Sequence, residues 1–233
     1  MALVACPTAS IGTTSRRSAR EGVDVFPVQV VDNVYFCGFT AESSFGAWSY
    51  LIVRSEADGG NILVDSPRFT MPLVRRIEAM GGVRLMYLTH RDDIADHAKF
   101  AARFGCPRVM HRADGAARLG IEQVTDGDGT IDIANGCVSV PTPGHTRGHQ
   151  VLLYRDTVLF TGDHLAWSPT RRTLTAFRDA CWYSWTEQIK SMERLLAYRF
   201  EWVLPGHGRR HHAPAESMRD ELAACVTWMK QRA

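Results

Sequence analysis

The chain has 233 residues, of which 45% are hydrophobic and 22% are charged, and these values are typical of a globular protein with room for one generous domain. Its formal net charge of +2 is too small to indicate a nucleic-acid partner or a membrane surface. No apolar stretch approaches the roughly 20 residues of a transmembrane helix. The six cysteines include no CxxC pair, so we expect reduced thiols and a cytoplasmic protein.

The first 22 residues differ in composition from the rest. They are rich in Ala, Ser, Thr and Arg, and no acidic residue precedes Glu21. Two interpretations stay open, a disordered extension or a targeting segment for an organelle such as the plastid. We therefore expect a single domain over residues 23–233.

The first half of that domain is predicted to contain several strands, followed by alternating helices and strands. The expected strands, chosen for alternating or continuous apolar residues, cover 23–31, 34–38, 48–54, 61–65, 83–89 and 108–111. Apolar side chains spaced by three predict a helix over 70–80, which Gly81 and Gly82 end. Two further helices are expected over 93–104 and in the stretch that ends at Gly120.

The second half repeats this order. Residues 126–140 show strand and turn chemistry, 150–155 and 157–161 form a predicted hairpin, and 202–204 is a last short strand. Amphipathic or apolar periodicity predicts helices over 185–199 and 215–232. Two similar halves that face each other would give an α/β sandwich of αββα type, with the strand ends meeting along one edge.

Histidine and aspartate gather at the ends of these expected strands. They occur in the segments 62–66, 89–97, 143–149, 161–164 and 204–208. Neutral imidazole and carboxylate together suit a divalent cation such as zinc, iron or manganese. The pattern therefore predicts a metal site.

Some of these residues are stronger ligand candidates than others. His90 and the Asp96-His97 pair lie where a strand gives way to a helix, and His145 and His207 are flanked by glycine, which lets the backbone approach a metal. Asp163 ends an apolar strand, where an unpaired carboxylate would be costly and a cation would offset that cost.

The remaining polar residues of these segments have competing interpretations. Asp93 is predicted to cap the helix over 93–104, and Asp92 is either a ligand or a group beside one. His149 is predicted to orient a neighbouring ligand, whereas His164 lines the cleft or packs against a helix. The aromatic residues at 182, 183 and 185 are core or cleft-wall residues, and the sequence does not separate the two.

The order of these motifs resembles that of the metallo-β-lactamase superfamily. The resemblance covers residues 23–213 and implies a four-layer αβ/βα sandwich with one or two metal ions at its edge. Asp65 matches the early structural aspartate, and Pro-Gly-His145-Thr-x-Gly-His matches the third motif. Asp163 and His207 match the bridging aspartate and the last histidine.

The second motif departs from the family pattern His-x-His-x-Asp-His, because this chain has His90-Arg-Asp-Asp-Ile-Ala-Asp-His97. The resemblance implies one site with His90, Asp92, His145 and Asp163, and a second with Asp96, His97, Asp163 and His207. Zinc is the first choice for one or two ions. The added carboxylate moves the preference toward iron or manganese.

The resemblance implies hydrolysis of a thioester, lactone or similar ester bond in a small-molecule substrate by metal-activated hydroxide. Asp96 would orient the nucleophile and pass on a proton. Two alternatives stay open, an iron-dependent oxidoreductase like the sulfur dioxygenases of this fold, and a non-catalytic metal-binding member. Only a short segment follows His207, so a glutathione thioester is not specifically expected. The substrate and the oligomeric state are left open.

Overall fold

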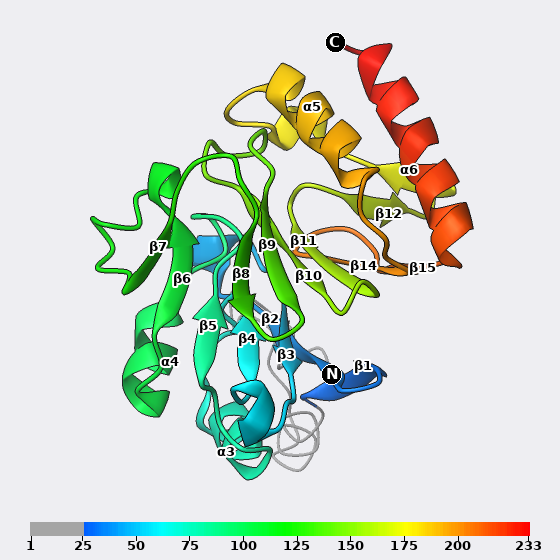
Figure 1. Cartoon of the computed structure of the whole chain (residues 1–233). Helices are drawn as coiled ribbons and strands as arrows, with labels where there is room; N and C mark the ends of the chain where they lie inside the picture. The colour runs from blue at the N-terminus through cyan, green and yellow to red at the C-terminus, as the bar shows by residue number, and fades with distance from the viewer. Residues whose placement is uncertain (1–25) are drawn as a thin grey trace, which may run out of the picture. The chain divides into compact units, whose positions relative to one another are not determined.

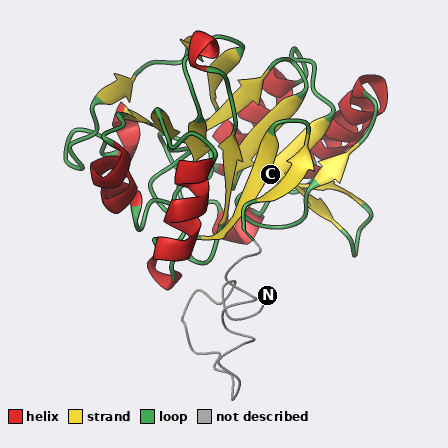
Figure 2. Ribbon diagram, turned by 90° about the horizontal axis from the view of Figure 1, so that it is seen from below, coloured by secondary structure: helices red, strands yellow, loops and turns green. Residues whose placement is uncertain are grey.

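The structure is a computed structural model that describes residues 26–233 (Figures 1 and 2); the predicted extension over 1–22 lies outside this part. The described chain divides into two compact units. The first runs to Leu88 and resumes over Asp92–Val109, and the second combines Thr89–Arg91 with Met110–Ala233. His90 therefore belongs to the second unit, although it lies in sequence among residues of the first. The single domain over 23–233 stays a prediction.

The first unit is built on a mixed sheet. Its strands lie in chain order: β1 (Val28–Val31), β2 (Val34–Phe39), β3 (Trp48–Ile52), β4 (Ile62–Val64), β5 (Leu85–Tyr87) and the first two residues of β6 (Arg108–His111). The pairs from β1 to β4 are antiparallel, and β4, β5 and β6 are parallel. Parallel neighbours need a crossover, which the helices α3 (Met71–Ala79) and α4 (His97–Phe104) provide.

The core of the first unit follows from the apolar content of its central strands. Every residue of β4 and β5 is buried, as expected for strands covered on both faces. Leu73, Val74 and Ile77 are the buried residues of α3, and Phe100 of α4 has no exposed area. These side chains anchor both helices to the unit.

The second unit has a sheet of its own. Its strand order is β15-β14-β11-β10-β9-β8, with β8 (Ile131–Ala134), β9 (Cys137–Pro141), β10 (Gln150–Tyr154), β11 (Val158–Gly162), β14 (Trp202–Pro205) and β15 (His211–His212). Only the β11–β14 pair of this sheet is parallel, and α5 (Trp185–Leu195) lies in the connection between these strands. The unit also contains β7 (Gln123–Thr125) and the hairpin of β12 (Ala166–Ser168) and β13 (Thr173–Thr175).

Helices α5 and α6 (Ala215–Lys230) lie side by side (Figure 1) and pack on the second sheet. Met192 and Leu195 from α5, Leu222 from α6 and Val151 and Leu153 from β10 belong to one buried cluster. Burying side chains of this kind contributes roughly 1.5–3 kcal/mol each. This cluster therefore fixes α5 with respect to the strands that precede the ligand loops.

The helix expected over 93–104 begins later than predicted, at His97, and its N-cap is Asp96. The prediction that Asp93 caps this helix was therefore wrong. The reason is tertiary: the backbone carbonyl of Asp93 accepts from Ser66 N at 3.3 Å, and Ala95 N donates to Ser44 Oγ at 2.9 Å. These bonds hold the residues before His97 outside the helix.

The helix expected up to Gly120 is also absent. The chain forms only a short 3-10 turn, Arg112–Asp114, and then Gly115 takes a φ of 87°, a left-handed conformation that ends a helix. Three further 3-10 turns lie at Glu42–Ser44, Glu56–Asp58 and Arg178–Ala180. The three-residue strands β12 and β13 were not predicted because they are too short to show alternation. No helix within residues 26–233 has both the length and the apolarity needed to cross a membrane.

Gly144 shows how closely the loop between β9 and β10 packs on α5. A Cβ at this position would lie 2.3 Å from Gln188 Cβ and 2.5 Å from Gln188 Cα. We predict that Gly144→Ala lowers the free energy of unfolding by about 2–3 kcal/mol, because backbone has to move to relieve the overlap. Gly129→Ala is the matched control, since a Cβ there meets nothing within 4 Å. Urea denaturation of both variants measures the difference, and equal stabilities would contradict the packing described here.

Candidate metal centre

The second sheet brings three ligand-bearing segments to one edge. Asp163 directly follows β11 and His207 follows β14, and because these strands are parallel neighbours, their carboxyl ends lie together. Gly206 N donates to Gly162 O at 2.7 Å, and this hydrogen bond holds the carboxyl ends of β11 and β14 together. Strand β10 is antiparallel to β11, so the loop before β10, which carries His145, reaches the same edge.

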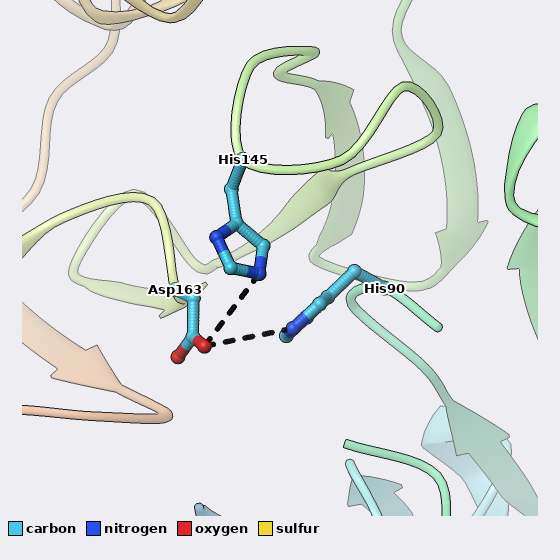
Figure 3. A group of neighbouring side chains, drawn as sticks. All are labelled: His90, His145 and Asp163. Atoms are coloured by element: carbon cyan, nitrogen blue, oxygen red, sulfur yellow. Dashed lines mark ion pairs between the residues drawn. The ribbon is translucent and has the colours of Figure 1, made fainter. Parts of the chain in front are cut away.

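His90, His145 and Asp163 point toward one another at this edge (Figure 3). The Nε2 atoms of both histidines lie 3.7 Å from Asp163 Oδ2, and one ligand atom from each residue lies within 4.8 Å of the others. Two ligands bound tetrahedrally at about 2.1 Å from a metal are about 3.4 Å apart. The three groups therefore fit a shared divalent cation.

His207 joins this group through Asp163. Its Nδ1 lies 2.7 Å from Oδ1 and 2.9 Å from Oδ2 of the aspartate, and its side chain is 32% exposed whereas that of Asp163 is 10% exposed. Burial raises the pKa of Asp163, but the hydrogen bond from His207 and the charges of His90, His207 and His145 outweigh it, so the pKa is lowered. The carboxylate is thus the ionised form that a metal ligand requires.

Two more histidines, His149 and His164, pack beside these candidate ligands, and both are buried, as are His90 and His145. The His149 ring lies 5.1 Å from that of His90 and 5.4 Å from that of His164. Burial, followed by the neighbouring imidazoles, lowers the pKa of His149 well below its usual range. Burial, followed by the charge of His145, lowers the pKa of His164 to about 3. Both rings are therefore neutral at pH 7.

These two histidines differ in their hydrogen bonds. His149 Nδ1 lies 2.9 Å from Thr142 Oγ1, which fixes the orientation of the ring. Its Nε2, and both ring nitrogens of His164, have no hydrogen-bond partner within the described part of the chain. A buried nitrogen without a hydrogen-bond partner lowers the stability of the fold. These nitrogens lie beside the candidate metal centre, where a polar group has a functional reason to be buried.

Helix α5 holds the loop that carries His145. Ser191 Oγ donates to Pro143 O at 2.7 Å and Arg194 donates to Pro141 O at 2.9 Å. At its amino end, Ser184 N donates to Gly144 O at 3.0 Å. Ser184 also caps the helix by accepting from Glu187 N. Two carbonyls of the loop and the last carbonyl of β9 are thus fixed to a single rigid element.

Asp114 connects the two ligand-bearing segments, and sequence reasoning missed it. Its carboxylate, on a residue that is 1% exposed, accepts from Arg91 N at 3.1 Å, from Thr146 Oγ1 at 2.7 Å and from Gly148 N at 2.7 Å. It therefore ties the residue after His90 to the loop of His145. The only signal in the sequence was a polar residue shortly after a strand end, in a stretch assigned to a helix.

The other predicted site residues belong to the first unit, where their local contacts are clear. The Asp96 carboxylate accepts from Lys99 Nζ at 2.6 Å and from Phe69 N at 2.8 Å. His97 Nδ1 lies 3.0 Å from a guanidinium nitrogen of Arg108. Their roles as metal ligands, and the catalytic role of Asp96, stay predictions.

The remaining three predicted residues of the first unit also sit close to strand ends. Asp65 follows β4, is buried, and has a φ of 57°; its N–H donates to Tyr87 O at 2.8 Å. Asp93 is fully buried, and Asp92 is half-buried in the bend that follows Arg91. What these carboxylates contribute to a metal centre stays a prediction.

Comparison with known proteins gives one curated relative by sequence. The chain is 34% identical over 113 residues to a hydroxyacylglutathione hydrolase from Acidiphilium cryptum, a match that covers 47% of this chain and 46% of the relative. The chain thus matches less than half the length of that protein. No protein-family model matches the chain.

Solved structures give the fold. The metallo-β-lactamase FIM-1 from Pseudomonas aeruginosa, in its mono-zinc form, aligns with a TM-score of 0.61 at 15% identity over 86% of this chain and 94% of its own. The protein TTHA1623 in a di-iron-bound form aligns with a TM-score of 0.54 at 20% identity over 81% and 94%. This chain has the metallo-β-lactamase fold. The α/β sandwich class predicted from the motif resemblance is thereby confirmed.

Metal binding by the second unit is tested by His145→Ala. A ligand at 100 times its Kd stabilises a protein by about 2.7 kcal/mol, so added zinc is expected to raise the Tm of the unchanged protein. The variant is expected to lose more than half of that shift. His212→Ala is the control, because this exposed histidine stacks on Trp202 with ring centroids 4.4 Å apart. Equal shifts in all three proteins would rule out His145 as a ligand.

A second prediction concerns Asp114. Asp114→Ala leaves two backbone N–H groups and a hydroxyl without their acceptor, and we expect a loss of about 2–4 kcal/mol in the free energy of unfolding. Because both ligand segments lose their common anchor, metal affinity should fall about 10–100-fold. Asp132→Ala, at an exposed position on β8, is the control. A stability loss with unchanged metal affinity, measured by competition with a chromophoric chelator, would limit Asp114 to folding.

Proposed function

We propose that this protein is a metal-dependent hydrolase that cleaves a thioester, lactone or similar ester bond of a small molecule. The observation that carries the proposal is the convergence of His90, His145 and Asp163, whose ligand atoms lie within 4.8 Å of one another. A curated relative over 113 residues is named as a hydrolase, which supports hydrolysis over the oxidoreductase alternative.

The chain's own residues have distinct tasks in this proposal. His90, His145 and Asp163 hold the cation, and the carboxylate offsets part of its charge in a buried setting. His207 is hydrogen-bonded to Asp163 and orients its carboxylate. It would also be a further ligand to the cation. His149 is neutral and packs against the rings of His90 and His145, and the neutral His164 stacks on His149, so together they support the ring orientations without repelling the metal.

A divalent cation held in this way supplies two effects, since it lowers the pKa of a water molecule to about 7 and polarises the carbonyl that is attacked. The protein contributes the buried surroundings that keep these charges strong. The sequence motif, rather than any contact, supports extending the proposal to a second ion with Asp96 and His97, and to Asp92 as a further ligand. In that extension Asp96 orients the nucleophile and transfers the proton.

Zinc is the metal that we propose first, because two imidazoles and one carboxylate match its catalytic sites. Iron or manganese are the alternatives, and related folds have been solved with zinc and with iron. Elemental analysis of protein purified without added metal distinguishes them.

The decisive assay measures hydrolysis of phenyl acetate and of an acyl thioester before and after metal removal with dipicolinate. We expect chelation to lower kcat/KM at least 100-fold and stoichiometric zinc to restore it. Asp163→Asn should abolish the restored activity, because an amide replaces the charged ligand. Asp156→Asn in the turn after β10 is the matched control and should behave like the unchanged protein. Full activity in metal-free protein would refute the proposal.

A further inference from the structure

The loop between Pro143 and His149 has a second functional face. His145 points toward Asp163 (Figure 3), whereas Arg147 lines a cavity of about 270 Å³ together with Pro143 and Tyr183. Since a water molecule takes up about 30 Å³ in the liquid, this cavity has room for a group as large as the head of an amino acid. The cavity therefore borders the loop that presents a metal ligand.

The charges that line this cavity are of both signs, and some of them are already paired. Asp126 accepts from Arg112 at 2.6 Å and Glu187 from Lys190 at 2.8 Å. Two histidines also line the cavity: His111 accepts from Ala113 N through Nδ1 and lies 3.2 Å from Gly127 O through Nε2, and His149 is hydrogen-bonded to Thr142. These groups are therefore committed to local structure.

Arg147 and Asp128 differ from these lining residues because their charged groups are not engaged by any described neighbour. Both are exposed and line the cavity, and neither side chain has a hydrogen bond or an ion pair with any residue in 26–233. A purely anionic ligand group would meet the Asp128 carboxylate, and a purely cationic one would meet the Arg147 guanidinium. A group that carries both charges can pair with each.

An aromatic pair spans the distance from the metal ligand to this cavity. Trp182 and Tyr183 are 60% and 47% exposed and are the only large hydrophobic side chains that the second unit exposes within the described residues. Their N–H groups donate to His145 O at 2.9 and 3.1 Å. The Trp182 ring centroid lies 6.2 Å from that of His145, and Tyr183 lines the cavity.

We propose that the cavity binds a zwitterionic end of the substrate, and that Trp182 and Tyr183 hold a flat apolar group between this end and the bond that is cleaved. The carboxylate pairs with Arg147 and the ammonium with Asp128. The inference rests on the proposed hydrolase function, and it names the substrate class as an ester or thioester attached through an apolar linker to an amino-acid head.

Four acetate esters of 4-alkyl-substituted phenols test this specificity. They are O-acetyltyrosine (a zwitterion), N,O-diacetyltyrosine (an anion), O-acetyltyramine (a cation) and 4-ethylphenyl acetate (neutral). The leaving phenol is nearly constant across the set, so differences in KM report on the charged end. We expect O-acetyltyrosine to have the lowest KM, about fivefold below the others, as partly exposed ion pairs allow.

Variants assign that preference to the cavity. Arg147→Gln should raise KM for O-acetyltyrosine about fivefold without raising it for O-acetyltyramine, and Asp128→Asn should do so without raising it for N,O-diacetyltyrosine. In both cases kcat should stay within twofold, since neither residue contacts the reacting bond. Arg219→Gln and Asp220→Asn on α6 remove the same charges elsewhere on the surface and should leave the KM order unchanged.

The two proposals fail in different ways. Equal KM values for all four esters, unchanged by Arg147→Gln, would overturn the cavity assignment and leave the hydrolase standing. If no ester is cleaved by metal-loaded protein, binding of O-methyltyrosine, which has no bond to cleave, is measured by calorimetry. Binding weakened about fivefold by Arg147→Gln would support the cavity without the hydrolase, and absence of binding would overturn it.

Discussion

A buried carboxylate sets the main constraint on the second unit. Asp163 stands at the end of an apolar strand, where an ionised group is tolerated only if positive charge or hydrogen-bond donors surround it. The parallel pairing of β11 with β14 supplies His207 at the same edge. The loop before β10 supplies His145, and Thr89–Arg91 supplies His90. The unit is thus arranged so that imidazoles face one negative charge.

Much of this arrangement follows from the sequence, because the strands that carry it are strongly apolar. Strands β10, β11 and β14 were predicted within one or two residues, and Asp163 and His207, which follow β11 and β14, were predicted as ligands from the motifs at these strand ends. His145 was identified by its glycine-flanked motif. The structure brings Asp163 together with His90, His145 and His207.

What the sequence did not reveal depends on contacts between distant residues. The start of α4 is set by Ser44 and Ser66, which lie far from it in the chain, so local helix signals misplaced it at Asp93. Asp114 hydrogen-bonds to Thr146 and Gly148 more than 30 residues away, and no spacing rule describes such a partner. A side chain that connects two loops belongs to no motif and to no periodic pattern of apolar residues, so the sequence alone does not identify it.

Helix α5 holds the His145 loop through Ser191, Arg194 and Ser184, and this has a mechanical consequence. A shift of α5 along its axis would move the carbonyl groups of Pro141, Pro143 and Gly144 together, and the loop with His145 would follow. Because α5 packs against α6 in a common buried cluster, the contact between the two helices helps to position the candidate ligand His145. We therefore expect substitutions at Met192 or Leu222, which belong to the same buried cluster, to change the position of the His145 loop as well as the stability of the unit.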